Sequence, residues 1–312
     1  MKSVAELREI INRYKPVEMN AHVHTHLCDG THEMTVDNIA REACVQGIGL
    51  IILTPHCHHL LKEGDFSLYW DTDPCIFERL REEIETYQKK DGRVRFLLSS
   101  EVDILSMDGG ISMEPSRQIE CNLDMITVTM NFHPGLSIRS VELSYYHRIR
   151  ELYDSGEAQK FMDTVGGKEK AMRMAYSAQA SAIRSCPYPC ALGHFWISHN
   201  SCFDGYNWFG LVESDLDAMK EGAAEVLDAL HRRGGMLDVT GIQDPDQQWL
   251  KDLGLNRKVV EPAGFFREFH RWVLREAEKL EIPVLCGSDA HALDAIGRSR
   301  IYQEYFNELL KK

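Results

Sequence analysis

The stretch Asn20-Ala21-His22-Val23-His24-Thr25-His26-Leu27-Cys28-Asp29-Gly30 begins at the end of an apolar run and contains two histidines spaced i and i+2. Side chains two positions apart on a strand point to the same face, so we expect His22 and His24 to converge. The pair Asp29-Gly30 marks a turn directly afterwards. Two converging imidazoles supply half of a metal site, although a lone His-x-His also occurs in solvated strands. The rest of the chain decides between these two interpretations.

Length and composition indicate a globular protein with a large core. The chain has 312 residues, of which 44% are hydrophobic and 27% charged, and its net charge is −13. This acidic balance provides no basic surface for long nucleic acid. No apolar run is long enough to cross a bilayer, and the N-terminus lacks the apolar core of a signal peptide. Nine cysteines without a repeated spacing favour a reducing cytoplasm, so we expect a cytoplasmic protein that does not bind membranes.

Short apolar runs alternate with segments of helical periodicity along the chain. This alternation predicts parallel strands joined by right-handed helical crossovers. The predicted strands span residues 17–24, 49–54, 94–101, 125–133, 190–195, 236–240 and 284–289, and examples of the predicted helices span 36–46, 74–88, 215–233 and 265–280. An amphipathic helix is also predicted near the N-terminus. Seven such units suit a (β/α) barrel, complete or distorted, better than an open doubly wound sheet, and we expect a single domain over residues 1–312. No Gly-x-Gly-x-x-Gly follows any strand, which argues against a dinucleotide site.

Metal-binding residue types recur where the predicted strands end. In a barrel the carboxyl ends of all strands face one mouth, so these side chains are expected to meet in a single cavity. They are His22, His24 and Asp29 after the first strand, His56 after the second, Glu101 after the third, His133 after the fourth, His194 after the fifth, and Asp289 and His291 after the seventh.

Each of these residues also has an ordinary structural explanation. A single histidine is more often hydrogen-bonded than a ligand, Glu101 could form an ion pair, and Asp289 could cap a helix. Coincidence at six of seven strand ends is harder to explain, because buried acids and imidazoles are costly unless something compensates them. Bound metal ions provide that compensation, so a metal cluster is predicted.

These residues resemble the PHP (polymerase and histidinol phosphatase) family of metal-dependent phosphoesterases. The family's His-x-His-Thr-x-x-Ser-Asp-Gly block is similar to residues 22–30, with Cys28 at the serine position. Its Thr-Asp-His element is similar to Thr54-Pro55-His56, and its closing Ser-Asp-Ala-His element is intact at residues 288–291. Its glutamate, mid-chain histidine and Gly-His element match Glu101, His133 and Gly193-His194. Pro55 replaces an acidic residue, and Thr240 stands where relatives often carry asparagine.

The resemblance implies a distorted (β/α)7 barrel that holds two to three divalent ions of zinc, manganese or iron at the carboxyl ends of its strands. It implies hydrolysis of a small phosphorylated metabolite by attack of metal-bound hydroxide on phosphorus. The implied metal ligands are His22, His24, Asp29, His56, Glu101, His133, His194, Asp289 and His291. Glu101 would bridge two ions, and Glu101, Asp289 and His26 are the candidate catalytic residues. Arg139 and Arg298 are candidates for binding phosphate, although surface ion pairs explain either arginine equally well.

Substrate choice is left open by these motifs. A helical insertion is predicted at about residues 134–189, which could form a lid or simply a long crossover helix. The insertion and the chain length are more similar to the histidinol-phosphatase branch, so histidinol phosphate is the leading candidate substrate. Nucleotide bisphosphates and cyclic phosphodiesters are alternatives within the same chemistry. A non-catalytic metal-binding PHP module is the alternative from a different class of protein.

Overall fold

The computed structural model describes residues 2–28, 30–56, 75–104, 106–113, 122–130, 157–195, 211–239 and 264–311. Strands and helices alternate along these residues, as predicted. The strands are β1 (Met19–Val23), β2 (Leu50–Leu53), β3 (Arg95–Leu98), β4 (Glu101–Asp103), β5 (Ile126–Thr129), β6 (Cys190–Leu192), β7 (Met236–Asp238) and β8 (Val284–Leu285). The α-helices are α1 (Val4–Ile11), α2 (Val36–Gln46), α3 (Cys75–Lys90), α6 (Glu157–Val165), α7 (Lys168–Ser185), α8 (Leu216–Arg233), α10 (Gly264–Lys279) and α11 (Arg298–Lys311). Short 3-10 turns occupy Pro16–Glu18, Glu213–Asp215 and Leu293–Ala295.

The strands form two parallel sheets, ordered β1-β2-β3 and β4-β5-β6-β7-β8. The predicted third strand, 94–101, covers β3 and reaches only the first residue of β4, whose remaining residues Val102 and Asp103 were not predicted as strand. Isolated parallel bridges link the two sheets at both junctions, between Val23 and Ala290 and between His56 and Glu101. The strands therefore follow one another around a common interior, while neither junction is a continuous ladder. The α/β class and the parallel order are confirmed.

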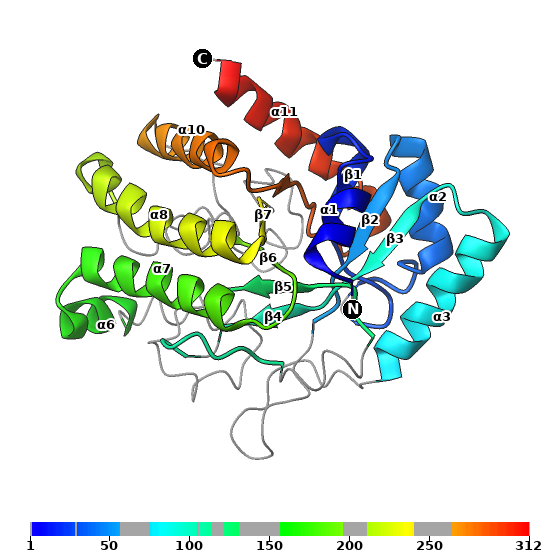
Figure 1. Cartoon of the computed structure of the whole chain (residues 1–312), viewed down its shortest axis with the longest axis horizontal. Coiled ribbons are helices and arrows are strands. Elements are labelled where there is room, and N and C mark those ends of the chain that lie inside the picture. The colour runs from blue at the N-terminus through cyan, green and yellow to red at the C-terminus, as the bar shows by residue number, and fades with distance from the viewer. Residues whose placement is uncertain are drawn as a thin grey trace.

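Helices lie outside the strands (Figure 1). Figure 1 shows α2 and α3 beside the first sheet, and α7, α8 and α10 beside the second. Helix α2 begins where the hydroxyl of Thr35 accepts from the backbone N–H of Asn38 and ends at Gly47, whose φ of 70° suits glycine. Its buried residues recur at helical spacing at positions 36, 39, 40 and 43, as expected for a helix that packs one face on a sheet.

The described part of the predicted insertion at 134–189 contains α6 and α7. Helix α7 packs against β5, β6 and α8, which is the position of a crossover helix between the fifth and sixth strands. Whether the earlier part forms a lid stays a prediction, because residues 134–156 lie outside the described chain.

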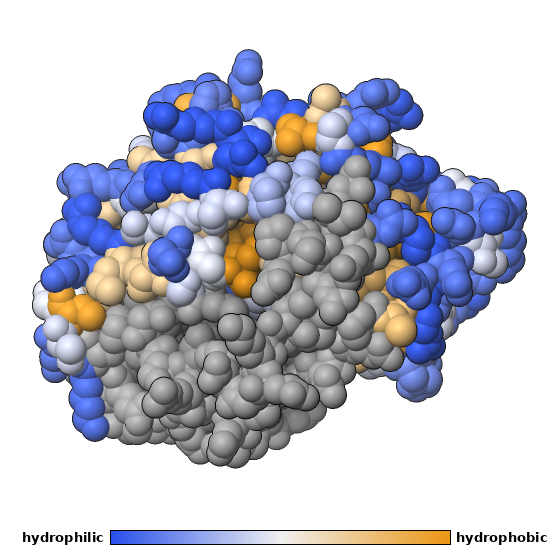
Figure 2. Space-filling view, turned by 60° about the horizontal axis from the view of Figure 1, so that its bottom comes forward, coloured by the Kyte–Doolittle hydropathy of each residue, from blue (hydrophilic) through white to orange (hydrophobic). Residues whose placement is uncertain are grey.

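Hydrophilic residues cover most of the described surface in Figure 2. Among the described helices, none combines the length and apolar character needed to cross a membrane.

The interior between the strands changes from apolar to polar along the strand direction. Near the strand starts, alternate residues form one buried apolar cluster, which α1 covers with Leu7 and Ile11. The strand residues of this cluster are Met19, Ala21, Leu50, Ile52, Leu97, Met125, Ala191, Met236 and Leu285. One step further, the hydroxyls of Ser99 and Thr127 share a hydrogen bond of 2.9 Å. Every second residue of each strand faces inward. Continuing this alternation past Ser99 places Glu101 in the interior, and continuing it past the end of β2 places His56 there.

An irregularity in β1 orients the first histidine pair. Met19 and Ala21 face the interior, while Val23 belongs to the outer core beneath the helices. The register of β1 on β2 accordingly shifts between Asn20 and Val23, where three steps on β1 match two on β2. A bulge of this kind re-aims the side chains that follow it, so His22 turns inward instead of joining Asn20 on the outer face.

Candidate metal centre

Seven of the nine predicted metal ligands lie among the described residues, and the structure brings all seven together. They form two adjoining groups in which one donor atom from each residue lies within 4.8 Å of the donors of the others. One group is His24, His56 and His291, and the other is His22, Glu101, His194 and Asp289. Asp29 and His133 lie outside the described residues, so their predicted roles stay predictions.

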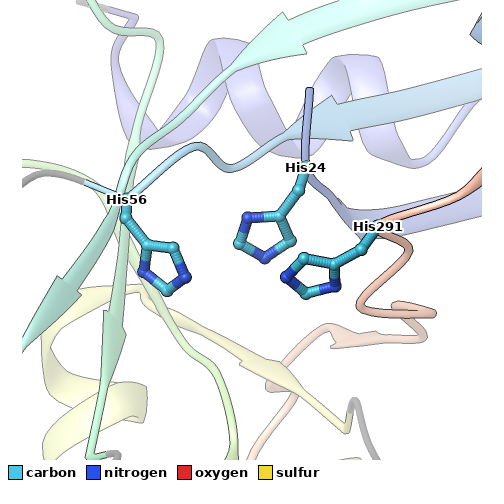
Figure 3. Close-up of side chains that lie close together, drawn as sticks. All are labelled: His24, His56 and His291. Carbon is cyan, nitrogen blue, oxygen red and sulfur yellow. The ribbon is translucent and has the colours of Figure 1, made fainter. Parts of the chain in front are cut away.

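The three-histidine group joins the ends of three different strands (Figure 3). His24 follows β1, His56 follows β2 and His291 follows β8. The rings of His24 and His291 stack with centroids 4.1 Å apart, and those of His24 and His56 are 4.7 Å apart. Figure 3 shows the three rings side by side with their nitrogens toward a shared space.

The second group is more deeply buried and contains both carboxylates. Nε2 of His22 lies 3.1 Å from Oε2 of Glu101 and 3.6 Å from Oδ1 of Asp289. Nε2 of His194 lies 3.2 Å from Oε1 of Glu101 and 3.9 Å from Oδ2 of Asp289. Two ligands bound tetrahedrally to one zinc ion at about 2.1 Å are separated by about 3.4 Å, so these spacings fit a shared ion.

Glu101 connects the two groups through its two oxygen atoms. Oε1 faces His194, whereas Oε2 faces His22 and also lies 3.4 Å from Nε2 of His24 and 3.5 Å from Nδ1 of His56. A carboxylate with one oxygen between the two groups and the other toward the second group is suited to bridging two cations. Imidazole with carboxylate is a donor set that accepts zinc, manganese or iron. The residues present therefore fit the implied divalent ions.

Backbone contacts between β1 and the segment after β8 fix the relative position of the two groups. The N–H of Asp289 donates to the carbonyl of His22 at 3.0 Å, and that of His24 donates to Ala290 at 2.9 Å. The Asn20 amide donates to the Ser288 hydroxyl at 2.7 Å and accepts from the Ser288 N–H at 3.0 Å.

Two of the predicted ligands adopt a left-handed backbone conformation. His194 has φ of 50° and Asp289 has φ of 54°, values that are uncommon for residues other than glycine. Such conformations cost free energy and persist where surrounding contacts determine them, often at functional sites. Here they turn the side chains of His194 and Asp289 toward Glu101 and His22 just after the strands end.

The acids and imidazoles shift one another's protonation. Burial acts to lower the pKa of His22, but Glu101, Asp238 and Asp289 outweigh it and raise that pKa to about 10. Burial acts in the opposite direction on Glu101, yet the charges of His56, His22 and His194 hold its pKa well below the usual range. The pKa of Asp289 is likewise held below its usual range, despite burial, by its hydrogen bond to His24 and by nearby histidines. The site thus stabilises ionised carboxylates beside positive charge. In the metal-free site protonated histidine supplies that positive charge, and bound metal ions can supply it instead.

Asp238 is a site residue that sequence reasoning missed. It ends β7, is 1% exposed, and places Oδ2 3.0 Å from Nδ1 of His22. The sequence analysis extended the sixth predicted strand to Thr240, whereas β7 ends at Asp238 and Thr240 lies outside the described residues. The available signal was alternation, because Met236 faces the interior and Asp238 follows it by two positions.

The remaining predicted residues lie apart from the two groups or outside the described chain. Nδ1 of His26 is 3.2 Å from the carbonyl of Met34, and its Nε2 is 3.4 Å from Glu83 on α3. These contacts direct His26 toward its own loop and α3. Arg298 is half-buried at the first residue of α11. Arg139 lies outside the described residues.

Comparison with known proteins gives a family match for one segment of the chain and two solved structures with a similar fold. The sequence profile of the PHP-associated family matches residues 267–304, which include the Ser288–His291 element. No curated protein matches this chain by sequence. A Listeria monocytogenes protein proposed as the histidinol phosphatase HisK matches in structure with a TM-score of 0.59 and 19% identity, over 92% of this chain and 99% of that protein.

A second structural match is the histidinol phosphate phosphatase of Lactococcus lactis, solved with zinc, L-histidinol and phosphate. Its TM-score is 0.52 at 12% identity, over 94% of each chain. The chain therefore has the fold of these histidinol phosphatases, and the resemblance to the PHP family is confirmed at the level of the fold.

Proposed function

We propose that this protein is a metal-dependent phosphatase that hydrolyses a small phosphate monoester, with histidinol phosphate as the leading candidate. One observation carries the proposal: two adjoining donor groups share Glu101, whose Oε2 lies within 3.5 Å of histidines from both groups while its Oε1 faces His194. The Lactococcus lactis protein of the same fold binds zinc, histidinol and phosphate, which supports the choice of substrate. The metals we propose are two to three ions of zinc, manganese or iron.

Divalent ions bound by these residues would lower the pKa of a coordinated water and offset the charge of a phosphoryl group. The chain's own contribution is to hold the ligands rigidly and apart from bulk solvent. His22, His24, Glu101 and His194 are all buried, so charges act strongly on one another there. Two of the described ligands, Glu101 and Asp289, are carboxylates. Two divalent cations carry more positive charge than these two carboxylates carry negative charge, so the loaded site would attract a phosphate dianion.

Arg298 is the described candidate for binding substrate outside the metal groups. It begins α11, seven residues after His291, and a guanidinium can hold phosphate through two parallel hydrogen bonds. Replacing it with lysine is expected to raise KM more than it lowers kcat, because charge is kept and the paired geometry is lost.

The test is phosphate release by the purified full chain after loading with zinc, manganese or iron. The substrates are histidinol phosphate, other small monoesters, a nucleotide bisphosphate and a cyclic phosphodiester. We expect the monoesters to be hydrolysed, with the highest kcat/KM for histidinol phosphate. Preferred hydrolysis of either of the last two would move the assignment to the alternative substrates.

A Glu101→Gln variant purified in the same way is the control against a contaminating phosphatase. It keeps the side-chain volume but removes the bridging charge, so its activity should fall by at least about a hundredfold. Failure of the fully metallated wild-type protein to hydrolyse any ester would leave the non-catalytic metal-binding module as the better explanation.

A further inference from the structure

We propose that Asp238 is a positioning residue that sets the tautomer and orientation of His22 for metal binding. The inference rests on the metal binding that the proposed function includes, but not on the phosphate chemistry. Asp238 ends β7 and His22 lies in β1, and β8 lies between these strands in the ring. Their side chains meet across the interior, where Asp238 Oδ2 is 3.0 Å from His22 Nδ1 and both residues are almost fully buried.

The two nitrogens of His22 face different partners. Nδ1 faces Asp238, while Nε2 faces Glu101 at 3.1 Å and Asp289 at 3.6 Å. An ionised carboxylate only accepts hydrogen bonds, so Asp238 keeps a hydrogen on Nδ1. A neutral imidazole then presents its lone pair at Nε2, on the side where the other donors converge. A carboxylate behind a histidine is a common way to fix the ring and raise the basicity of a ligand.

Asp238 lies beside Gly193, the residue that directly follows β6. Gly193 has no side chain, and a Cβ built there would lie 3.4 Å from Asp238 Oδ2. The same Cβ would lie 3.0 Å from Thr127 Cγ2 and 3.1 Å from Thr129 Cγ2. A larger residue at position 193 would therefore crowd the space beside the carboxylate.

The competing explanation is that Asp238 is a buried partner that contributes only to stability. Zinc affinity separates the two explanations, measured by chelator competition on metal-free full chain without substrate. The affinities are compared after correction for protonation of His22, because loss of Asp238 also lowers the pKa of that ring. Asp238→Ala should bind zinc about 10- to 100-fold more weakly than wild type, the usual cost of losing such a carboxylate. Asp238→Asn keeps the volume and folds more readily, and it should also bind more weakly because the charge is lost.

Asp124→Asn is the matched control. Asp124 is another buried aspartate, but it pairs with Arg81 and Lys2 and accepts from the N–H of Leu98, apart from the two donor groups. Its substitution should lower thermal stability and leave zinc affinity within about twofold of wild type. Zinc affinity at the wild-type level in both Asp238 variants would overturn the proposal, whatever their stability.

Nitrogen-15 NMR of the zinc-loaded wild-type chain provides a second readout that a purely structural role would not move. Long-range proton–nitrogen spectra distinguish the two histidine tautomers, and His22→Gln assigns the signal. We expect hydrogen on Nδ1 of His22, and hydrogen on Nε2 would overturn the proposal. Neither measurement uses a phosphate ester, so a protein that binds zinc but hydrolyses nothing would contradict the proposed function alone.

Discussion

Zinc affinity is expected to rise about tenfold for each pH unit between pH 7 and pH 9. His22 must be neutral to bind a metal ion, but the surrounding carboxylates raise its pKa to about 10 in the metal-free protein. The fraction of molecules with neutral His22 is therefore about 1 in 10³ at pH 7 and about 1 in 10 at pH 9. Apparent affinity follows that fraction, so the two-unit change strengthens binding about a hundredfold and releases one proton from His22 for each ion bound.

Two measurements check this expectation. Competition against a chelator that buffers free zinc gives the affinity at each pH, after correction for protonation of the chelator. Calorimetry in buffers with different ionisation enthalpies counts the protons released. In Asp238→Asn, one of the carboxylates that raise the pKa of His22 is lost, so the affinity should level off at a lower pH than in wild type. Affinity that is constant from pH 7 to 9, with no proton released, would refute the reasoning.

Four further expectations concern stability. The metal-free protein should lose stability as pH rises from about 6.5 towards about 10, because the raised pKa of His22 means that its favourable charge is lost over that range, and urea unfolding across this range checks it. It should also lose stability in acid, because the lowered pKa of Glu101 means that its stabilising charge is lost as pH falls, and an acid titration with no such loss would contradict the account. Gly193→Val should cost about 1–3 kcal/mol through crowding and also weaken zinc binding, with Gly193→Ala milder; equal stability of all three proteins would contradict the packing described. Leu7→Ala, at the opposite end of the interior, should cost about 2–4 kcal/mol in urea unfolding while zinc affinity stays unchanged.

The sequence predicted the strand order and most of the described site because both follow from short-range patterns. Periodicity located α2 at its observed bounds, and the apolar runs located every described strand except β4, of which they reached only Glu101. Parallel strands bring their carboxyl ends together, so histidines and acids at those ends had to meet once the fold was right. His56 and Glu101 illustrate this, since they lie far apart in the chain and form an isolated bridge.

Features that depend on tertiary contacts could not be predicted from the sequence patterns. The bulge in β1 has no obvious sequence signal, because Asn20 to Val23 is compatible with a regular strand. Without it, His22 would share the outward face of Asn20, and the correct expectation that His22 and His24 converge would have placed both outside the interior. The direction of His26 was also undetermined, since its contact with Glu83 depends on how its loop meets α3.

Asp238 shows how the alternation of one strand can assign a residue that motif spacing overlooks. Six of seven strand ends were given an acid or a histidine from the sequence, and the sixth strand was left without one. On that strand Met236 joins the apolar layer, so the next inward position, residue 238, lies at the level of Ser99 and Thr127, directly below the ligands. An aspartate there is buried among charged donors, and burial of a lone carboxylate would be costly. Its hydrogen bond to His22 resolves that cost, and by doing so it gives the sixth strand a part in the same site.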